Sequence, residues 1–217
     1  MGRPSTAIDT ATDCIVIGTI CFGWFIVVSV EWVASDFPVR PFTDASLLDL
    51  IVREALYAVT ALVYLHARGY DLTRLLPAPS AVGTLIGLGL YVASILAWWP
   101  IDAAVRSALP APQPIEEMVA NASVSLLPVL AMSVVNGLYE EVFLLGYLQS
   151  ALERFGLAFA VGASLLVRVA YHLYQGPIGA ASVLAFGLIL GVYFIRQRKL
   201  WPVVCAHIFA DICGFAL

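Results

Sequence analysis

Long apolar runs alternate with short polar connectors along the whole chain. The connectors carry most of the charges and several prolines, as in "SDFPVRPFTD" and "HARGYDLTRLLPAPS". Each run approaches the roughly 20 residues that a helix needs to cross a hydrocarbon core of about 30 Å. The pattern predicts an all-α, polytopic membrane helical bundle with about seven transmembrane helices. These helices are expected at about residues 13–34, 46–66, 82–99, 122–150, 156–174, 178–195 and 200–217.

The composition points to the same class. Of the 217 residues, 61% are hydrophobic and 12% are charged. An ordinary soluble domain carries about twice that charged fraction, so this class is excluded. We find no internal repeat and no separate soluble domain, and residues 1–217 are predicted to form a single membrane domain. The expected surroundings are a lipid bilayer, and no nucleic-acid partner is expected.

The basic residues of the connectors predict an orientation. With the N-terminus inside, only Arg40 and Arg106 fall on the outer side. The inner side then holds seven basic residues: Arg3, Arg68, Arg74, Arg154, Arg196, Arg198 and Lys199. This imbalance follows the positive-inside rule and favours an N-in topology. The compact chain favours a multi-pass protein of a cell membrane, with the bacterial inner membrane as the expected location.

Two small-residue spacings predict close helix packing. Gly83 and Gly87 lie four residues apart in the third apolar segment, and Gly187 and Gly191 do so in the sixth. Small residues at this spacing let two membrane helices approach each other closely. We interpret them as packing features without a chemical role.

Ionisable residues inside the apolar segments require an explanation, because each costs about 2.5–3.5 kcal/mol on insertion scales. Asp49, Arg53 and Glu54 cluster near one end of the second segment, with Asp49 and Arg53 four residues apart. We interpret this cluster as an ion pair at the membrane interface.

The stretch "NGLYEEVFLLGY" places two adjacent carboxylates, Glu140 and Glu141, near the middle of the fourth segment. Glu141 is rotated by about 100° from Glu140 on a helix, so both can line one cavity without sharing a face. Five residues fall on one predicted inward-facing stripe: Ser133, Asn136, Gly137, Glu140 and Tyr147.

Polar residues also recur at helical spacing on two later segments. Ser164, Arg168 and His172 follow one another at steps of four in the fifth segment. His207 and Asp211 are four residues apart in the seventh. Since all these groups are expensive to bury, we predict that three of the last four segments share one polar site.

Two carboxylates and two imidazoles can perform general acid/base chemistry on a water molecule. Imidazole N–H groups aimed at a developing oxyanion would add electrostatic stabilisation. The sequence contains neither the GxSxG motif of a serine hydrolase nor the HExxH motif of a zinc peptidase. No cofactor is expected. Two histidines with two glutamates can also ligate a metal, and this alternative is kept open but not favoured.

Three stretches in this order resemble a known family: "EEVFLLGYL", "RVAYHLYQG" and "HIFAD". They are similar to the motifs EExxxR, FxxxH and HxxxN/D of the CPBP family of intramembrane proteases, which includes the CAAX prenyl endopeptidases and Abi-type bacterial proteins. The resemblance covers residues 122–217, the expected catalytic core. Residues 1–121 form helices without a recognised motif.

The resemblance implies roles for five residues. Glu140 would be the base that activates water, with Glu141 as its supporting acid. His172 would orient the water or stabilise the oxyanion, and His207 and Asp211 would complete the oxyanion side. The implied reaction is hydrolysis of a peptide bond in a membrane-associated or C-terminally processed protein.

The sequence departs from the family pattern at one position. Leu145 stands where EExxxR has its arginine, and Arg168 stands at the first place of the second motif. We hypothesise that Arg168 supplies the missing positive charge, with Asn136 and Tyr147 as further supporting residues.

Two other functions remain open. A non-proteolytic, family-like protein could bind or assemble with a partner in a larger membrane complex, and the loss of the motif arginine favours this alternative. A proton-coupled transporter is a third possibility, which the lack of inverted repeats weakens.

The heights of the two site histidines conflict with a bundle of straight helices. His207 is expected about 12 Å from the inner edge, whereas His172 is close to the outer edge. Straight helices would separate the two imidazoles by roughly 10 Å or more in depth. We expect either that the turn at Gln175–Pro177 dips into the protein or that the sixth helix is short and tilted.

Overall fold

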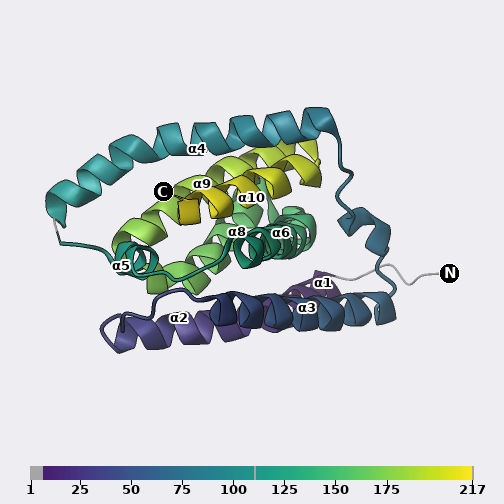
Figure 1. Ribbon diagram of the computed structural model, residues 1–217. Coiled ribbons are helices and arrows are strands. Elements are labelled where there is room, and N and C mark those ends of the chain that lie inside the picture. The colour runs from purple at the N-terminus through teal and green to yellow at the C-terminus, as the bar shows by residue number, and fades with distance from the viewer. Residues whose placement is uncertain (1–6, 110, 217) are drawn as a thin grey trace.

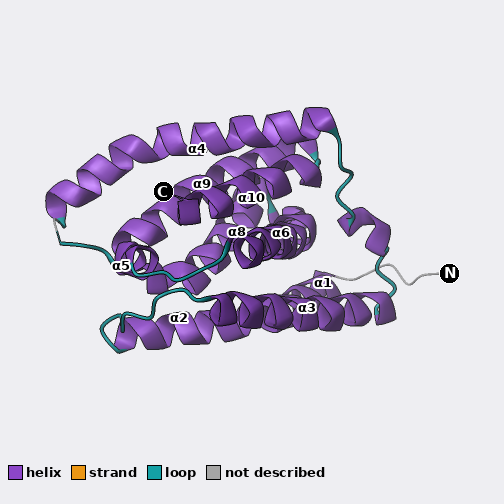
Figure 2. Ribbon diagram, in the orientation of Figure 1, coloured by secondary structure: helices purple, strands orange, loops and turns teal. Residues whose placement is uncertain are grey.

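The structure is a computed structural model that describes residues 7–109 and 111–216. It is 85% helical, and the described residues form no strand (Figure 2). The all-α class is therefore confirmed, and seven helical rods follow the seven apolar segments. In order, the rods are α1 (Ala7–Gly18) with α2 (Trp24–Ala34), α3 (Asp44–Ala67), α4 (Ala81–Ala108), α6 (Leu126–Glu141) with α7 (Ser150–Leu152), α8 (Leu157–His172), α9 (Gly176–Gln197) and α10 (Leu200–Ala216).

Shorter elements complete the chain. Two π-helical segments, Thr19–Gly23 and Val142–Gln149, join the halves of the first and fourth rods. Short 3₁₀ turns cover Leu72–Leu75, Glu153–Phe155 and Leu173–Gln175. The short helix α5 (Pro114–Ala120) begins with a proline at its first position, where the missing N–H has no helical partner to lose.

Four helical stretches are long and apolar enough to cross a membrane: Thr10–Ala34, Ala81–Ala108, Leu126–Phe155 and Leu157–Gln197. Leu200–Phe215 is a shorter apolar helix. These lengths fit a membrane protein. The N-in orientation stays a prediction, and Arg3, one of the residues behind it, lies outside the described residues.

The helices form three layers, and α6 and α8 make up the middle one (Figure 1). α4 lies along the top over α9 and α10, the first rod and α3 lie at the bottom, and α6 and α8 lie between them. In an 18-residue apolar window of Leu126–Phe155, 67% is buried, against 17% for such a window of Ala81–Ala108 on the outside. The segment with the two glutamates is therefore the central helix of the bundle.

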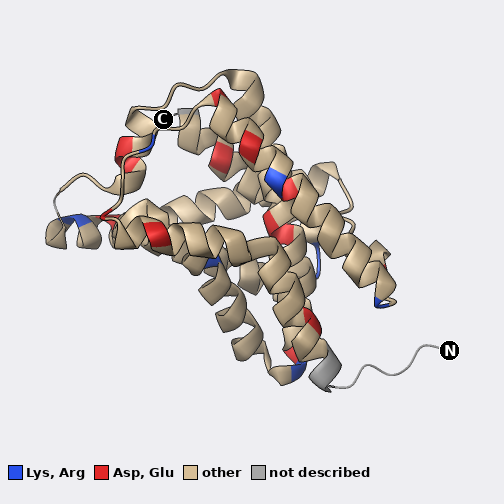
Figure 3. Cartoon of the chain, turned by 90° about the horizontal axis from the view of Figure 1, so that it is seen from below, with Lys and Arg blue, Asp and Glu red and all other residues tan. Residues whose placement is uncertain are grey.

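Polar contacts at the helix ends join neighbouring rods, and Figure 3 shows the few charged residues along the chain. Arg198 pairs with Glu153 where α9 and the fourth rod end. At the opposite end of the bundle, the Asp44 carboxylate at the start of α3 accepts hydrogen bonds from the Ser125 N–H and hydroxyl just before α6. The connectors thus tie the bundle together at both ends.

The glycine spacings of the sequence lie at helix contacts, as predicted. A Cβ at Gly87 of α4 would lie 2.6 Å from Cys205 Cβ of α10, so the glycine lets these helices approach. In α9, a Cβ at Gly187 would lie 2.7 Å from Cδ of Arg168. Gly187 therefore makes room for one long polar side chain in the bundle interior.

The predicted ion pair on α3 is present, but it does not include Glu54. Arg53 Nε lies 2.6 Å from Asp49 Oδ2, and both side chains are exposed. Glu54, one residue further along, is only 2% exposed. Leu47, Glu54 and Ala61 are buried at intervals of seven, so Glu54 belongs to the inward stripe of α3 and its predicted place in the ion-pair cluster is wrong.

Candidate active site

The adjacent glutamates end α6 at the centre of the bundle, and both are buried. Glu140 is 5% exposed and Glu141 is fully buried. The π-helix Val142–Gln149 follows directly. Its i→i+5 hydrogen bonds give it more residues per turn than an α-helix, and such segments often mark functional sites.

Glu141 is held by two cationic partners on other helices. Arg168 Nη2 of α8 donates to both of its carboxylate oxygens, at 2.7 and 2.9 Å. His207 Nδ1 of α10 lies 2.6 Å from Oε1. Hydrogen bonds between an arginine and a carboxylate are charge-assisted and are roughly twice as strong as neutral ones. Glu141 therefore fixes α6, α8 and α10 to one another at this level.

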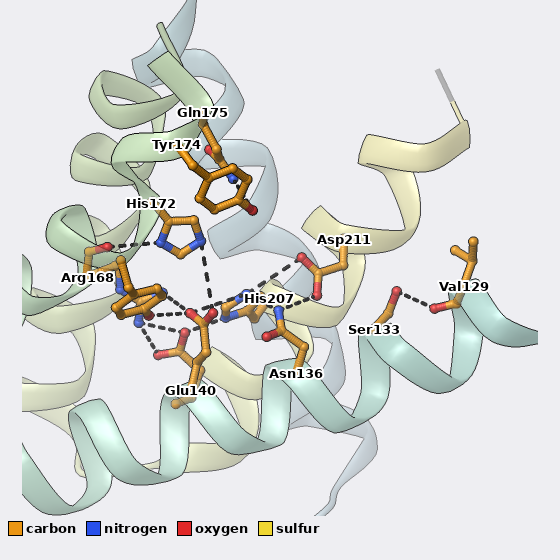
Figure 4. Close-up of polar contacts among 12 residues, drawn as sticks. Val129, Ser133, Asn136, Glu140, Arg168, His172, Tyr174, Gln175, His207 and Asp211 are labelled. Carbon is orange, nitrogen blue, oxygen red and sulfur yellow. Dashed lines mark hydrogen bonds and ion pairs between the residues drawn. The ribbon is translucent and has the colours of Figure 1, made fainter. Parts of the chain in front are cut away.

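Glu140 faces a different set of groups (Figure 4). Its Oε2 accepts a hydrogen bond of 2.5 Å from the Tyr171 hydroxyl and one of 3.4 Å from Arg168 Nη1. His207 Nε2 lies 3.8 Å from Oε2, and His172 Nε2 lies 4.0 Å from Oε1. Glu140 is thus flanked by two imidazoles and anchored through only one of its oxygens.

Asn136 and Asp211 complete the polar cluster. The Asn136 amide donates to Asp211 Oδ2 at 3.0 Å and lies 3.3 Å from His207 Nε2. His207 Nε2 is also 3.6 Å from Asp211 Oδ1. Asn136 and Glu140 are one helical turn apart on α6, which is why both reach the same cluster.

The hydrogen bonds define which ring nitrogen of each histidine carries a proton. His172 Nδ1 lies 2.9 Å from the Arg168 carbonyl oxygen, which can only accept, so Nδ1 is the donor. His207 Nδ1 likewise donates to the Glu141 carboxylate. Both Nε2 atoms are therefore directed to Glu140 or its neighbours.

The expected separation of the two imidazoles in depth is wrong, because both lie within 4.0 Å of the same carboxylate. The chain after His172 makes a 3₁₀ turn, Leu173–Gln175, whose residues are partly buried. The Tyr174 N–H donates to the buried Ser29 hydroxyl, and a Cβ at Gly176 would lie 2.5 Å from Pro114 Cδ at the start of α5. α5 thus covers the turn, which is the inward dip that one of the two alternatives predicts.

A cavity of about 400 Å³ lies next to the cluster, within the size range of small-molecule binding sites. Glu140 lines this cavity, whereas Glu141 does not. The polar lining includes Asn136, Arg168, His172, His207 and Asp211. Much of the remaining lining is aromatic or aliphatic and comes from the N-terminal half of the chain: Phe22, Phe25, Leu47, Leu50, Ile95, Trp98 and Ile115.

Position 145, where the motif arginine is missing, faces an apolar cluster. Leu145 is 1% exposed and packs with Leu190, Phe194 and Leu200. The positive charge beside the glutamates comes instead from Arg168, which is also 1% exposed and contacts both carboxylates. This contact is the one that the hypothesis of a substitute arginine requires.

Tyr147 is not part of the cluster, although the predicted stripe includes it. Its ring packs edge-on against Tyr70 at 5.3 Å, in a hydrophobic cluster that also contains Cys14. The prediction extended an α-helical period beyond Glu141. The π-helix from Val142 changes that period and turns Tyr147 away from the cavity.

Glu140, Glu141 and His207 offer ligand atoms within 4.8 Å of one another, a spacing that could hold a metal ion. However, Glu141 already binds Arg168 with both oxygens and His207 with one. A metal cation here would lie next to the Arg168 guanidinium, which would repel it. The donor set therefore fits a pair of carboxylates neutralised by arginine better than a metal centre.

Sequence reasoning missed several polar residues at the cavity, among them Tyr171 and Glu54. Tyr171 donates to Glu140 and stacks on Phe22 at 5.1 Å between ring centroids. Its spacing of three from Arg168 was an available signal. Glu54 also lines the cavity, and its place on the apolar stripe of α3 could have indicated this.

Residues 122–213 match the family model of the Rce1-like type II CAAX prenyl endopeptidases. The matched segment begins just before α6 and ends within α10. It contains Glu140, His172, His207 and Asp211, all of which line the cavity. No curated protein and no solved structure matches the chain.

Proposed function

We propose, from the match of residues 122–213 to the Rce1-like type II CAAX prenyl endopeptidases, that the chain is an intramembrane endopeptidase of the CPBP family. It hydrolyses a peptide bond in a membrane-associated or C-terminally processed protein, and Glu140 activates the attacking water. One observation carries the proposal above all. Glu140 is a carboxylate at a cavity wall, flanked by two imidazoles and supported by the Arg168–Glu141 pair.

The attacking water is proposed to bind between Glu140 Oε1 and His172 Nε2, which lie 4.0 Å apart. Both atoms are acceptors when His172 is neutral, because Nδ1 donates to the Arg168 carbonyl. The water can donate one hydrogen to each and keep a lone pair free for the carbonyl carbon. Glu140 then takes the proton and passes it to the leaving amine nitrogen as the C–N bond breaks.

The developing oxyanion is proposed to form on the side of α10. The Asn136 amide lies there, held by Asp211 at 3.0 Å. A protonated His207 would present a second donor, Nε2–H, at the same place, 3.3 Å from Asn136 Nδ2. Fixed donors in a site shielded from water are often the largest single contribution to catalysis of this type.

Arg168 is proposed to position Glu140 and Glu141, the role that the motif arginine would have in the family pattern. Its contacts at 2.7 and 3.4 Å allow two adjacent carboxylates to share a buried site without a metal. The alternative of a non-proteolytic assembly protein depended on the missing charge at Leu145. Because a guanidinium is present beside both glutamates, Leu145 no longer favours that alternative.

We propose that the chain divides functionally between residues 121 and 122, as the sequence predicts. Residues 122–217 form the catalytic core, and the helices before it complete the substrate cavity. Phe22, Leu47 and Trp98 from those helices line the same cavity as Glu140. Residues 1–121 therefore contribute walls to the site and no predicted catalytic group.

The test uses the full chain in lipid vesicles with two probes: a prenylated peptide ending in a C-a-a-X motif, and a membrane-inserted peptide without a prenyl group. We expect the wild-type protein to cleave at least one probe at a single bond, as identified by mass spectrometry. Glu140→Gln keeps the shape of the side chain but removes the base, so cleavage should fall by about 10²–10⁴-fold.

The control is Glu117→Gln, which makes the same change on α5, outside the residues that line the cavity. This variant should cleave at the wild-type rate. If Glu140→Gln accumulates, stays folded and cleaves as fast as Glu117→Gln, the proposed base is wrong.

A further inference from the structure

One carboxylate in the cavity has no partner among the described residues. Glu54 of α3 is 2% exposed, lines the cavity and has a buried Oε2 without any hydrogen bond. The other two carboxylates in the lining are bonded, Glu140 to Tyr171 and Asp211 to Asn136. Buried polar groups are nearly always paired, so an unpaired carboxylate at a binding cavity indicates a partner that comes with the ligand.

The charge balance of the cavity indicates the sign of that partner. Glu54, Glu140 and Asp211 are acidic, and Arg168 is the one arginine or lysine among the lining residues. Its guanidinium is already occupied by both oxygens of Glu141. A second negative group from a substrate would be repelled at this point, whereas a cation would be attracted.

The surroundings of Glu54 fit a long cationic side chain. Phe22, Phe25 and Tyr139 line the same cavity, and Phe25 also contacts Tyr57, three residues after Glu54 on α3. Lysine and arginine side chains pack their aliphatic stems against such surfaces, and aromatic rings attract their charged ends. An unpaired carboxylate in a cavity that is partly lined by aromatic rings is thus suited to an ammonium or guanidinium group.

We propose that Glu54 is a specificity residue that binds a lysine or arginine side chain of the substrate near the bond that Glu140 cleaves. The inference rests on the proposed function for its catalytic part, but the binding part stands independently. It narrows the substrate class to peptides with a basic residue that enters the membrane-embedded cavity. Glu54 acts on binding and makes no contact with the reacting atoms.

The experiment separates binding from cleavage. Palmitoylated peptides are prepared in pairs that differ only in one residue, lysine or its uncharged analogue norleucine, with this residue scanned along the peptide. Binding is measured by fluorescence with the full-length Glu140→Gln protein in lipid nanodiscs, where no cleavage is expected. Cleavage of the same pairs is measured with the wild-type protein in vesicles.

We expect at least one lysine position to improve binding by about tenfold over norleucine, as a charge-assisted hydrogen bond would. Adding Glu54→Gln should reduce this ratio to about one without weakening the norleucine peptide. Glu54→Gln should also unfold at a temperature no lower than the wild-type protein, because the wild-type carboxyl has no partner to lose. Adding Glu54→Lys should shift the preference to peptides with glutamate at that position.

Different results overturn the two proposals. The specificity proposal fails if no pair shows a preference, if no peptide binds, or if the preference survives Glu54→Gln. A preference that depends on Glu54 without any cleavage by the wild-type protein supports the binding site and contradicts the endopeptidase. If cleavage is lost in Glu140→Gln but is equally fast for the lysine and norleucine peptides, the result supports the endopeptidase and contradicts the role of Glu54.

Discussion

Two acid–arginine pairs on the helices have almost the same length but lie in different surroundings. Asp49 and Arg53 lie on the outer face of α3, 2.6 Å apart, with 58% and 39% of their side chains exposed. Glu141 and Arg168 join α6 and α8 at 2.7 Å and are 0% and 2% exposed. The distances are almost equal, so burial is what separates the two pairs.

Burial changes what each pair can do. Exposed pairs generally contribute between zero and about 1 kcal/mol, because water and salt screen them. Breaking a buried pair leaves an unpaired charge and costs about 3–5 kcal/mol, although a well-packed apolar replacement of both partners is often neutral. Stability alone therefore does not explain the Glu141–Arg168 pair. The contact of Arg168 with Glu140 at 3.4 Å explains the pair better, because the same guanidinium that neutralises Glu141 also positions the proposed base.

The largest difference between the pairs is expected when each loses its arginine. Arg168→Leu leaves Glu141 buried without its main partner, so the free energy of unfolding in mixed micelles should fall by about 3–5 kcal/mol and cleavage should be lost. The matched change Arg53→Leu removes an exposed partner and should change neither property measurably. Equal stability and activity of the two variants would show that Arg168 does not replace the motif arginine.

A smaller effect is expected from the hydroxyl that anchors Glu140. Tyr171→Phe removes a hydrogen bond to a carboxylate and should lower stability by about 1.5–3 kcal/mol. Cleavage should slow through kcat more than through KM, because the base loses its orientation. Tyr147→Phe makes the same change outside the cavity and should have little effect on kinetics. A stronger kinetic effect at Tyr147 would restore the straight-stripe prediction.

The smallest effect concerns the space around the Arg168 side chain. Gly187→Ala places a methyl group 2.7 Å from Arg168 Cδ, so we expect a loss of about 1–3 kcal/mol and slower cleavage as the guanidinium shifts. Gly162→Ala on α8 adds the same methyl group with nothing within 4 Å. It should be neutral or slightly stabilising. Indistinguishable melting temperatures for the two variants would contradict the close fit around Arg168.

The sequence predicted the fold and the residues that meet at Glu140, because both depend on periodicity within single helices. Apolar length predicts membrane helices, and steps of four place Arg168 and His172, or His207 and Asp211, on one ridge each. The expensive burial of these groups then favours a common site. The contact of Arg168 with the glutamates was expected because Leu145 replaces the motif arginine while Arg168 adds an arginine in the second motif.

The features that sequence reasoning missed depend on contacts between distant segments. The inward turn after His172 was one of two expected alternatives, but its contacts with Ser29 and with Pro114 of α5 are not revealed by any local pattern. The π-helix after Glu141 changed the direction of Tyr147. Glu54 was misplaced because its neighbours Asp49 and Arg53 form an exposed pair, although it lies on the other face of α3.

The most direct test of the account compares two carboxylate-to-amide substitutions in the same vesicles with the same peptide. Asp49→Asn removes a charge from the exposed pair, and Glu140→Gln removes the proposed base from the cavity wall. The account predicts cleavage by Asp49→Asn at the wild-type rate and a rate about 10²–10⁴-fold lower for Glu140→Gln. Equal rates of cleavage by the two folded variants would contradict it.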